Sequence, residues 1–131
     1  MKKLINGIDF GSVWAMSGFF NFYGQGWPYH KILKILGVDL KPITFVSKTV
    51  TLLAREGNMP LKKNLMPVEL IPKSIYINFL HKHALNAVSL SGPGADEIIS
   101  SVKLHKKVKP FQLSFMSVAE TEKERLNEFN G

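Results

Sequence analysis

The most constraining feature of this sequence is the run Thr44–Thr51, TFVSKTVT, which contains neither glycine nor proline. Its first half is apolar and β-branched, a pattern typical of a buried strand. Its second half carries Lys48 among hydroxyl side chains. An ammonium group without a partner is costly to bury, so Lys48 either reaches solvent where the strand ends or faces a ligand. This run alone leaves both interpretations open.

Two other stretches favour the ligand interpretation. Ala15–Gly18 and Leu85–Gly94 are small, polar or glycine-rich turns that adjoin apolar runs. In folds with parallel strands, ligands bind at the carboxyl ends of the strands, where the following loops meet. We therefore expect these two loops and the end of the Lys48 strand to form one ligand site.

The composition indicates a single domain, residues 1–131, with a core of its own. Of the 131 residues, 45% are hydrophobic, and the mean hydropathy is +0.03, which argues against disorder. No apolar run approaches the roughly 20 residues that cross a bilayer, and the basic start lacks the apolar segment of a signal peptide. The sequence has no cysteine, so disulfides and thiolate zinc sites are excluded. We expect a cytoplasmic protein without a membrane span.

The net charge of +7 raises the question of nucleic-acid binding. However, the lysines are scattered along the chain, and no base-reading motif accompanies them. A solvated surface is the simpler interpretation, and no nucleic-acid partner is expected. The four histidines, His30, His81, His83 and His105, lack metal-ligand spacing, so no metal site is predicted either.

Hydrophobic periodicity predicts alternating strands and helices. Strands are expected at 13–16, 44–48 and 108–115, and helices at 28–36, 94–107 and 117–129, the last with a capping box at Ser117–Glu120. A long excursion over 51–72 follows the second strand, with short strands at 75–77 and 84–90. Alternating strands and helices predict an α/β fold with a parallel sheet and right-handed crossovers.

Four motifs occur in a fixed order along the chain: Ser17-Gly18, Lys48-Thr49-Val50-Thr51, Gly57-Asn58, and the segment from Asn86 to Gly94. In order and spacing they resemble motifs of the dihydroorotate dehydrogenase family, FMN-dependent (β/α)8 barrels of pyrimidine biosynthesis. The family's first strand ends in a small turn, its second in Lys-Thr-x-Thr, and a Gly-Asn element and an Asn-x-x-Gly-Leu-x-x-x-Gly segment follow. The resemblance extends over nearly the whole chain.

The resemblance implies a flavoprotein oxidoreductase that converts dihydroorotate to orotate with FMN as its cofactor. It implies that the backbone of Ser17 and Gly18 lies against the flavin and that Thr49 hydrogen-bonds it. Lys48 would lie between the flavin and the substrate. A fixed positive charge at that position stabilises the anionic reduced ring that develops during hydride transfer.

The same resemblance assigns substrate contacts to the third loop. Asn86 would bind the polar edge of dihydroorotate or a similar ring, with Val88, Ser89 and Leu90 beside it. Ser89 stands where the family usually has glycine, and its Cβ narrows the space for a substrate. A related flavin barrel that acts on a different ring compound is therefore an alternative.

The resemblance also implies that the chain is the N-terminal portion of a barrel. A complete barrel needs about 250 residues and eight βα units, whereas this sequence predicts an incomplete (β/α)8 TIM barrel of about three units. The family's catalytic base would lie beyond Gly131, so no catalytic residue is predicted. The other alternative is a fragment that is inactive alone and acts only in assembly with another chain. Its open strand edges would favour oligomers, including homo-oligomers.

Overall fold

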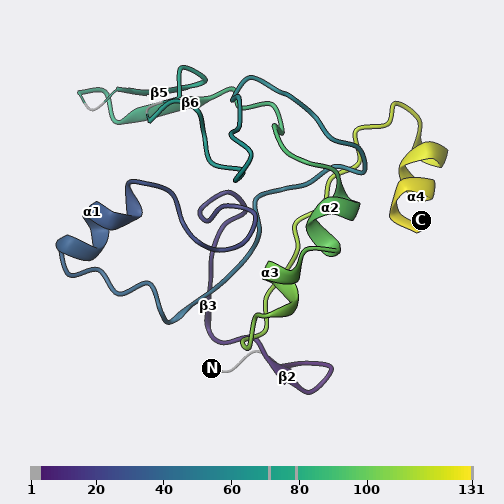
Figure 1. Cartoon of the computed structure of the whole chain (residues 1–131), viewed down its shortest axis with the longest axis horizontal. Helices are drawn as coiled ribbons and strands as arrows, with labels where there is room; N and C mark the ends of the chain where they lie inside the picture. Colours follow the sequence, from purple (N-terminus) through teal and green to yellow (C-terminus); the bar gives the residue numbers. More distant parts are fainter. Residues whose placement is uncertain (1–3, 71, 79, 131) are drawn as a thin grey trace.

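The computed structural model describes residues 4–70, 72–78 and 80–130. Its secondary-structure elements are short and are joined by long loops (Figure 1). In chain order they are β1 (Leu4–Ile5), β2 (Ile8–Asp9), β3 (Val13–Trp14), α1 (His30–Ile35), β4 (Ile43–Thr44), β5 (Ile75–Asn78), β6 (His83–Asn86), α2 (Ala95–Ile99), α3 (Val102–His105) and α4 (Glu122–Asn130). In the described part of the chain, no helix is long and apolar enough to cross a bilayer.

Three stretches of chain run parallel through the middle of the molecule. β3 pairs in parallel with β4. Residues 45–51 continue β4 and make parallel bridges with a third stretch, Val46 with Gln112 and Val50 with Phe115. We call residues 43–51 the central segment. The three predicted strand regions thus lie side by side in chain order, and they form an open arrangement within the described residues. A (β/α)8 barrel stays a prediction.

The third predicted strand, 108–115, forms isolated bridges rather than a regular strand. Side chains explain part of the interruption. The Ser114 N–H donates to the Ser47 hydroxyl at 2.9 Å instead of to a backbone carbonyl, and Pro110 has no N–H to donate. The stretch is still tied to the central segment, because the N–H of Val50 donates to the Ser114 carbonyl at 2.9 Å.

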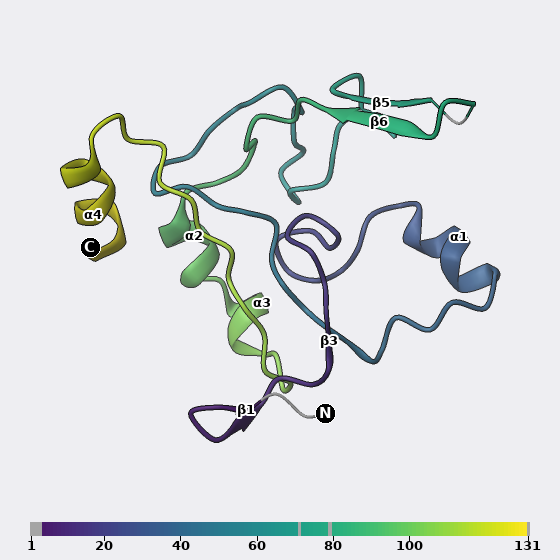
Figure 2. The ribbon, with the colours of Figure 1, turned by 180° about the vertical axis from the view of Figure 1, so that it is seen from behind.

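The hydrophobic core lies between the central segment and the helices α2 and α3. Phe22, Val50, Ile98 and Leu104 are buried there, and the partly buried Phe115 packs against them. Figure 2 shows α2 and α3 running along the stretch that leads to α4. The core therefore packs against one side of the central segment, while residues near its carboxyl end, such as Lys48 and Thr49, line a pocket on another side.

The predicted helix at 94–107 is two helices, α2 and α3. Ser101 separates them, because its side chain accepts a backbone N–H two residues further on and caps α3. Within α2, Ile98 is fully buried but Ile99 is exposed, and Val102 at the start of α3 is exposed as well. The continuous stripe that the sequence predicts is therefore wrong in its second half.

The last helix begins at Glu122, and the predicted capping box at Ser117–Glu120 is wrong. The Ser117 hydroxyl instead accepts the Ala119 N–H at 3.3 Å, in a local turn. The box forms four residues later: the Glu124 N–H donates to the Thr121 hydroxyl at 3.3 Å, and the Thr121 N–H donates to the Glu124 carboxylate at 3.2 Å.

The first helix, α1, is shorter than predicted and faces outward. It begins at His30 rather than at Pro28, and Gly37, with φ +82°, follows its end as predicted. His30 is its only buried residue, while Ile32 and Leu36 of the predicted apolar stripe are exposed. Figure 1 shows α1 standing away from the core.

The long excursion leads into a hairpin. β5 and β6 pair antiparallel over the whole of both strands, from Ile75 opposite Asn86 to Asn78 opposite His83. The short strand predicted at 75–77 is confirmed, but the one predicted at 84–90 ends at Asn86. The residues after Asn86 turn back toward the central segment and form a wall of the site.

Candidate functional site

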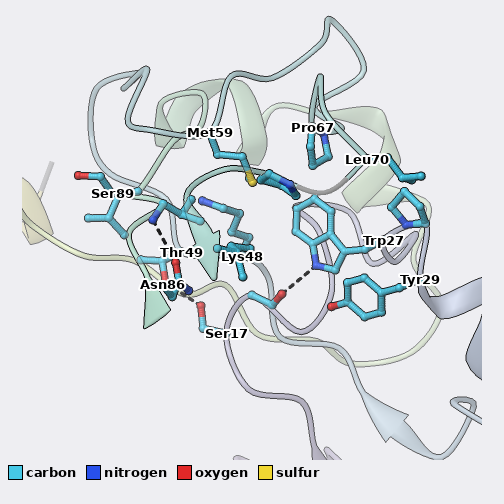
Figure 3. Close-up of a pocket in the computed structure, with 16 residues that line it drawn as sticks. Ser17, Trp27, Tyr29, Lys48, Thr49, Met59, Pro67, Leu70, Asn86 and Ser89 are labelled. Atoms are coloured by element: carbon cyan, nitrogen blue, oxygen red, sulfur yellow. Dashed lines mark hydrogen bonds between the residues drawn. The ribbon is translucent and has the colours of Figure 1, made fainter. Parts of the chain in front are cut away.

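A cavity of about 410 Å³ lies beside the end of the central segment, and we call it the Lys48 pocket. All the residues that the sequence analysis assigns to cofactor or substrate line it: Ser17, Gly18, Lys48, Thr49, Asn86, Val88, Ser89 and Leu90 (Figure 3). These residues come from three loops that are distant in sequence, and the fold brings them together. The volume falls in the range of roughly 300–1,000 Å³ that small-molecule sites have.

Lys48 extends into the middle of this pocket (Figure 3). Only 8% of the residue is exposed. Its Nζ donates to the Ser91 carbonyl at 2.6 Å and lies 5.1 Å from the centre of the Phe22 ring. Burial lowers the pKa of Lys48 from 10.5 to about 8, so the amine is mostly charged at pH 7. The sequence left open whether Lys48 reaches solvent or faces a ligand. Its burial in a pocket favours the second interpretation.

Hydroxyl groups form a chain along one side of the pocket. The Ser17 Oγ lies 2.6 Å from the Thr49 Oγ1, which lies 3.0 Å from the Ser114 Oγ. Ser17 also donates to the Ser47 carbonyl at 3.1 Å. Either hydroxyl of each pair can be the donor. Each hydroxyl has one proton, so in the arrangement in which Ser17 donates to Ser47, Thr49 donates to Ser17 and Ser114 donates to Thr49. Thr49 is thus left with acceptor capacity toward a ligand N–H.

Asn86 and Val88 form the start of the opposite wall. The Asn86 Oδ1 accepts the Val88 N–H at 3.0 Å. Asn86 is an exposed residue, and its amide nitrogen has no partner among the described residues. The Val88 carbonyl accepts both the Asn58 N–H and the Ser91 hydroxyl, each at 3.0 Å. The backbone groups of Val88 are therefore satisfied within the protein, and Val88 presents its side chain to the pocket. Asn86 remains a hydrogen-bond donor to a ligand.

The wall then turns through two residues with left-handed backbone. Ser89 has φ +62° and Leu90 has φ +59°, a region that disfavours residues other than glycine. This conformation would favour a glycine at position 89. Ser89 adopts it at a cost and places its hydroxyl at the edge of the pocket (Figure 3).

Non-local hydrogen bonds hold this wall against the 55–59 loop. Arg55 and Gly92 exchange two backbone hydrogen bonds of 2.8 Å. The Ser91 hydroxyl, fully buried, accepts the Met59 N–H at 3.0 Å. Gly57 lies in a tight place: a Cβ there would collide with the Ser91 Oγ, and φ is +55°. The Gly-Asn turn of the sequence therefore serves close packing behind the pocket.

Several lining residues were not found by sequence reasoning. They are mainly apolar and aromatic: Trp27, Pro28, Tyr29, Met59, Pro67, Leu70, Pro72 and Ile75. The Trp27 Nε1 donates to the Gly18 carbonyl at 2.8 Å, which positions the indole over the Ser17 loop. The aromatic run of 19–29 could have indicated Trp27 and Tyr29, but its earlier members Phe22 and Tyr23 pack into the core instead. No sequence signal marks the lining residues from Met59 onward.

The pocket combines donors with apolar walls. Its described lining residues include no aspartate, glutamate, cysteine or histidine. An ammonium group, an amide nitrogen and hydroxyls face a space bounded by Trp27 and Met59 (Figure 3). Such an arrangement suits a flat ligand rich in acceptors or weakly anionic, and it disfavours a cation. No group of acidic or histidine side chains that could hold a metal ion occurs among the described residues.

Comparisons of this chain with protein-family models, with curated proteins and with solved structures found no match.

Proposed function

We propose that this chain provides the flavin and substrate site of an FMN-dependent oxidoreductase of the dihydroorotate dehydrogenase type, acting in the cytoplasm. The observation that carries the proposal is the meeting of three motif-bearing loops around Lys48 in one pocket. The resemblance that suggested a common site rests on sequence order alone, whereas the pocket is a property of the tertiary structure. The two are separate lines of support for the same set of residues.

The residues of the pocket fit the cofactor ring. FMN presents carbonyl oxygens and ring nitrogens that accept hydrogen bonds, together with one ring N–H. Lys48 can serve the acceptor edge, and Thr49 has acceptor capacity for the ring N–H. Trp27 and Met59 offer apolar surface for the faces of a planar ring. When bound, FMN supplies the hydride acceptor of this reaction class.

The protein's own part in the reaction is electrostatic. The Lys48 ammonium is buried beside apolar surface, where a charge acts more strongly than it does in water. It would stabilise negative charge that grows on the ring during hydride transfer. Asn86 would hold the polar edge of dihydroorotate through its amide nitrogen. The proposal assigns no catalytic base.

Titration of FMN into the full chain at pH 7, followed by quenching of flavin fluorescence, tests the proposal. We expect saturable quenching, at least about tenfold weaker binding for Lys48→Met, and partial recovery for Lys48→Arg. Lys82→Met removes an exposed lysine in the β5–β6 turn and is the matched control. The absence of saturable quenching, or equal affinity of Lys48→Met and Lys82→Met, would overturn the proposal.

The choice of substrate is a separate question within the same proposal. Addition of orotate to the FMN-loaded chain should perturb the flavin absorbance spectrum, and Asn86→Ala should remove this perturbation without loss of FMN. Ser89 narrows the substrate side of the pocket, which favours a smaller or differently substituted ring as the alternative ligand. A response to uracil but not to orotate would support that alternative.

Assembly with another chain is the second candidate role, and one observation favours it. Large apolar side chains are exposed on two helices, including Ile35 on α1 at 84% and Phe129 on α4 at 62%. Exposed apolar surface of this kind commonly marks an interface. Sedimentation velocity over a range of concentrations tests this role, and a monomer at all concentrations would count against self-association.

A further inference from the structure

The Lys48 amine has a contact that does not depend on its charge. Its Nζ donates to the Ser91 carbonyl at 2.6 Å, and no acidic side chain lies among the described residues of the pocket. A neutral amine donates to a carbonyl as an ammonium does, so loss of the proton keeps this hydrogen bond. It also creates a nitrogen lone pair inside a pocket that a small molecule can enter.

The environment brings this loss of the proton close to neutral pH. Burial lowers the pKa of Lys48 to about 8. The neutral fraction at pH 7.5 is then about two hundred times that of a lysine at its ordinary pKa. The other ionisable side chain among the described lining residues is Tyr29, and burial raises its pKa, so it carries no charge at this pH. Acidic side chains in the lining would have raised the pKa of Lys48. The polar side chains that line this pocket are instead hydroxyls and an amide.

The remaining polar groups of the pocket favour an acid function on the incoming molecule. The Asn86 amide nitrogen has no partner among the described residues and is a free donor toward a carboxylate. Trp27 and Met59 bound the space with apolar surface, which disfavours further charged groups on the molecule. We propose that Lys48 is a reactive amine that forms an imine with small oxo acids in the Lys48 pocket, a role distinct from the flavin chemistry proposed above.

The reaction is balanced without an oxidant or a reductant. The Nζ lone pair adds to the carbonyl carbon, and a proton passes from nitrogen to the former carbonyl oxygen. The resulting carbinolamine loses water, and a carbon–nitrogen double bond forms. The Ser91 carbonyl remains beside the Lys48 nitrogen. When the imine is protonated, its N–H donates a charge-assisted hydrogen bond to this carbonyl, which stabilises the iminium form.

Reductive trapping tests the proposal. The full chain is incubated with glyoxylate and sodium cyanoborohydride at pH 7.5, digested, and mapped by mass spectrometry for lysines that carry one added carboxymethyl group. We expect Lys48 to be modified at least about tenfold faster than the exposed Lys82. Lys107 is the stricter comparison, since burial also lowers its pKa but it lies over the Phe45 ring outside the pocket. It should react more slowly than Lys48.

Equal rates of modification at Lys48 and Lys82 in the chain without substitutions would overturn the proposal. This comparison does not depend on whether any variant folds. Lys48→Arg keeps the charge and should abolish the fast modification while the circular dichroism spectrum is retained. Added FMN separates the two proposals. Protection of Lys48 by FMN supports both, whereas fast modification that FMN does not slow supports the reactive amine and overturns the placement of the flavin.

Discussion

The Lys48 pocket and the helix α1 are built in opposite ways. The pocket wall is held by hydrogen bonds between residues distant in sequence, such as the pair formed by Arg55 and Gly92. α1 is held by its own local turns, such as the bond from the Leu36 N–H to the Ile32 carbonyl. It is attached to the rest mainly through His30, whose ring lies 4.8 Å from that of Phe19.

This difference separates positioning from local stability. Cross-links between distant loops fix side chains relative to one another, as a binding site requires. A helix that meets the fold through one buried residue keeps its shape but contributes little to the position of other groups. Substitutions in the pocket wall should therefore lower the unfolding free energy more than matched substitutions in or beside α1.

Gly57→Ala should cause a large loss, about 3 kcal/mol of unfolding free energy. Its Cβ would lie 2.7 Å from the Ser91 backbone nitrogen and from the Val88 carbonyl oxygen, so the wall must move. Gly37→Ala is the matched control after α1, because φ is also positive but nothing lies within 4 Å of the added Cβ. It should cost about 1 kcal/mol. Urea unfolding measures both, and equal losses would contradict the contrast.

The stability of the fold should rise with pH because of Lys48. Its pKa is about 8 in the folded chain and 10.5 for an ordinary lysine in water. Between these values the unfolded chain keeps the proton and the folded chain releases it, so the folded state gains stability as pH increases. The gain is about 2 kcal/mol between pH 8 and pH 10.5. Urea unfolding at a series of pH values should show this rise. Lys48→Met should remove the part that Lys48 contributes and leave the part that Lys107 contributes, because burial also lowers the pKa of Lys107. Lys34→Met on α1 is the charge-matched control.

Ser91→Ala should lower the unfolding free energy by about 1.5 kcal/mol. The change leaves the buried Met59 N–H without its acceptor and removes a donor from the Val88 carbonyl. Ser100→Ala, at the exposed end of α2, removes only a local bond to the Asp96 carbonyl and should cost under about 0.5 kcal/mol. Thermal unfolding of the two variants side by side gives the comparison, which fails if the losses are alike.

Ser89→Gly should stabilise the chain by about 0.5–1 kcal/mol. Ser89 has φ +62°, which glycine adopts without steric cost, and its hydroxyl makes no hydrogen bond to the described residues. The gain is expected even though glycine makes the unfolded chain more flexible. A measured loss of stability in urea would show that the serine side chain supports the wall.

Ile35→Ser on α1 should have the smallest effect, within about 0.5 kcal/mol. Ile35 is 84% exposed, so its replacement changes very little of the apolar surface that the single chain buries. By contrast, Ile98→Ala, at a fully buried residue, should lower the unfolding free energy by several kcal/mol. If Ile35→Ser alters sedimentation without altering unfolding, α1 lies in an interface.

The elements whose local signals agree with their surroundings were predictable from sequence. The turn at Gly37 and the strand at 75–77 follow from residue type and periodicity, and both are present. The helix at 94–107 was predicted as one piece because its apolar spacing is regular, but the Ser101 cap divides it. The capping box was placed too early because Ser117–Glu120 and Thr121–Glu124 carry the same pattern and only backbone geometry distinguishes them.

Residue types and their order along the chain are enough to indicate which side chains could serve a site. Lys48, Thr49 and Asn86 are polar groups placed at the ends of apolar runs, and Ser17-Gly18 is a turn beside another such run. Folding brings these groups to one cavity, makes the Ser91 carbonyl the partner of Lys48 and places Trp27 along one side, and none of these contacts follows from the order of the residues. Residue type and spacing act locally along the chain, whereas the depth of Lys48 and its lowered pKa arise from segments that approach one another only after folding.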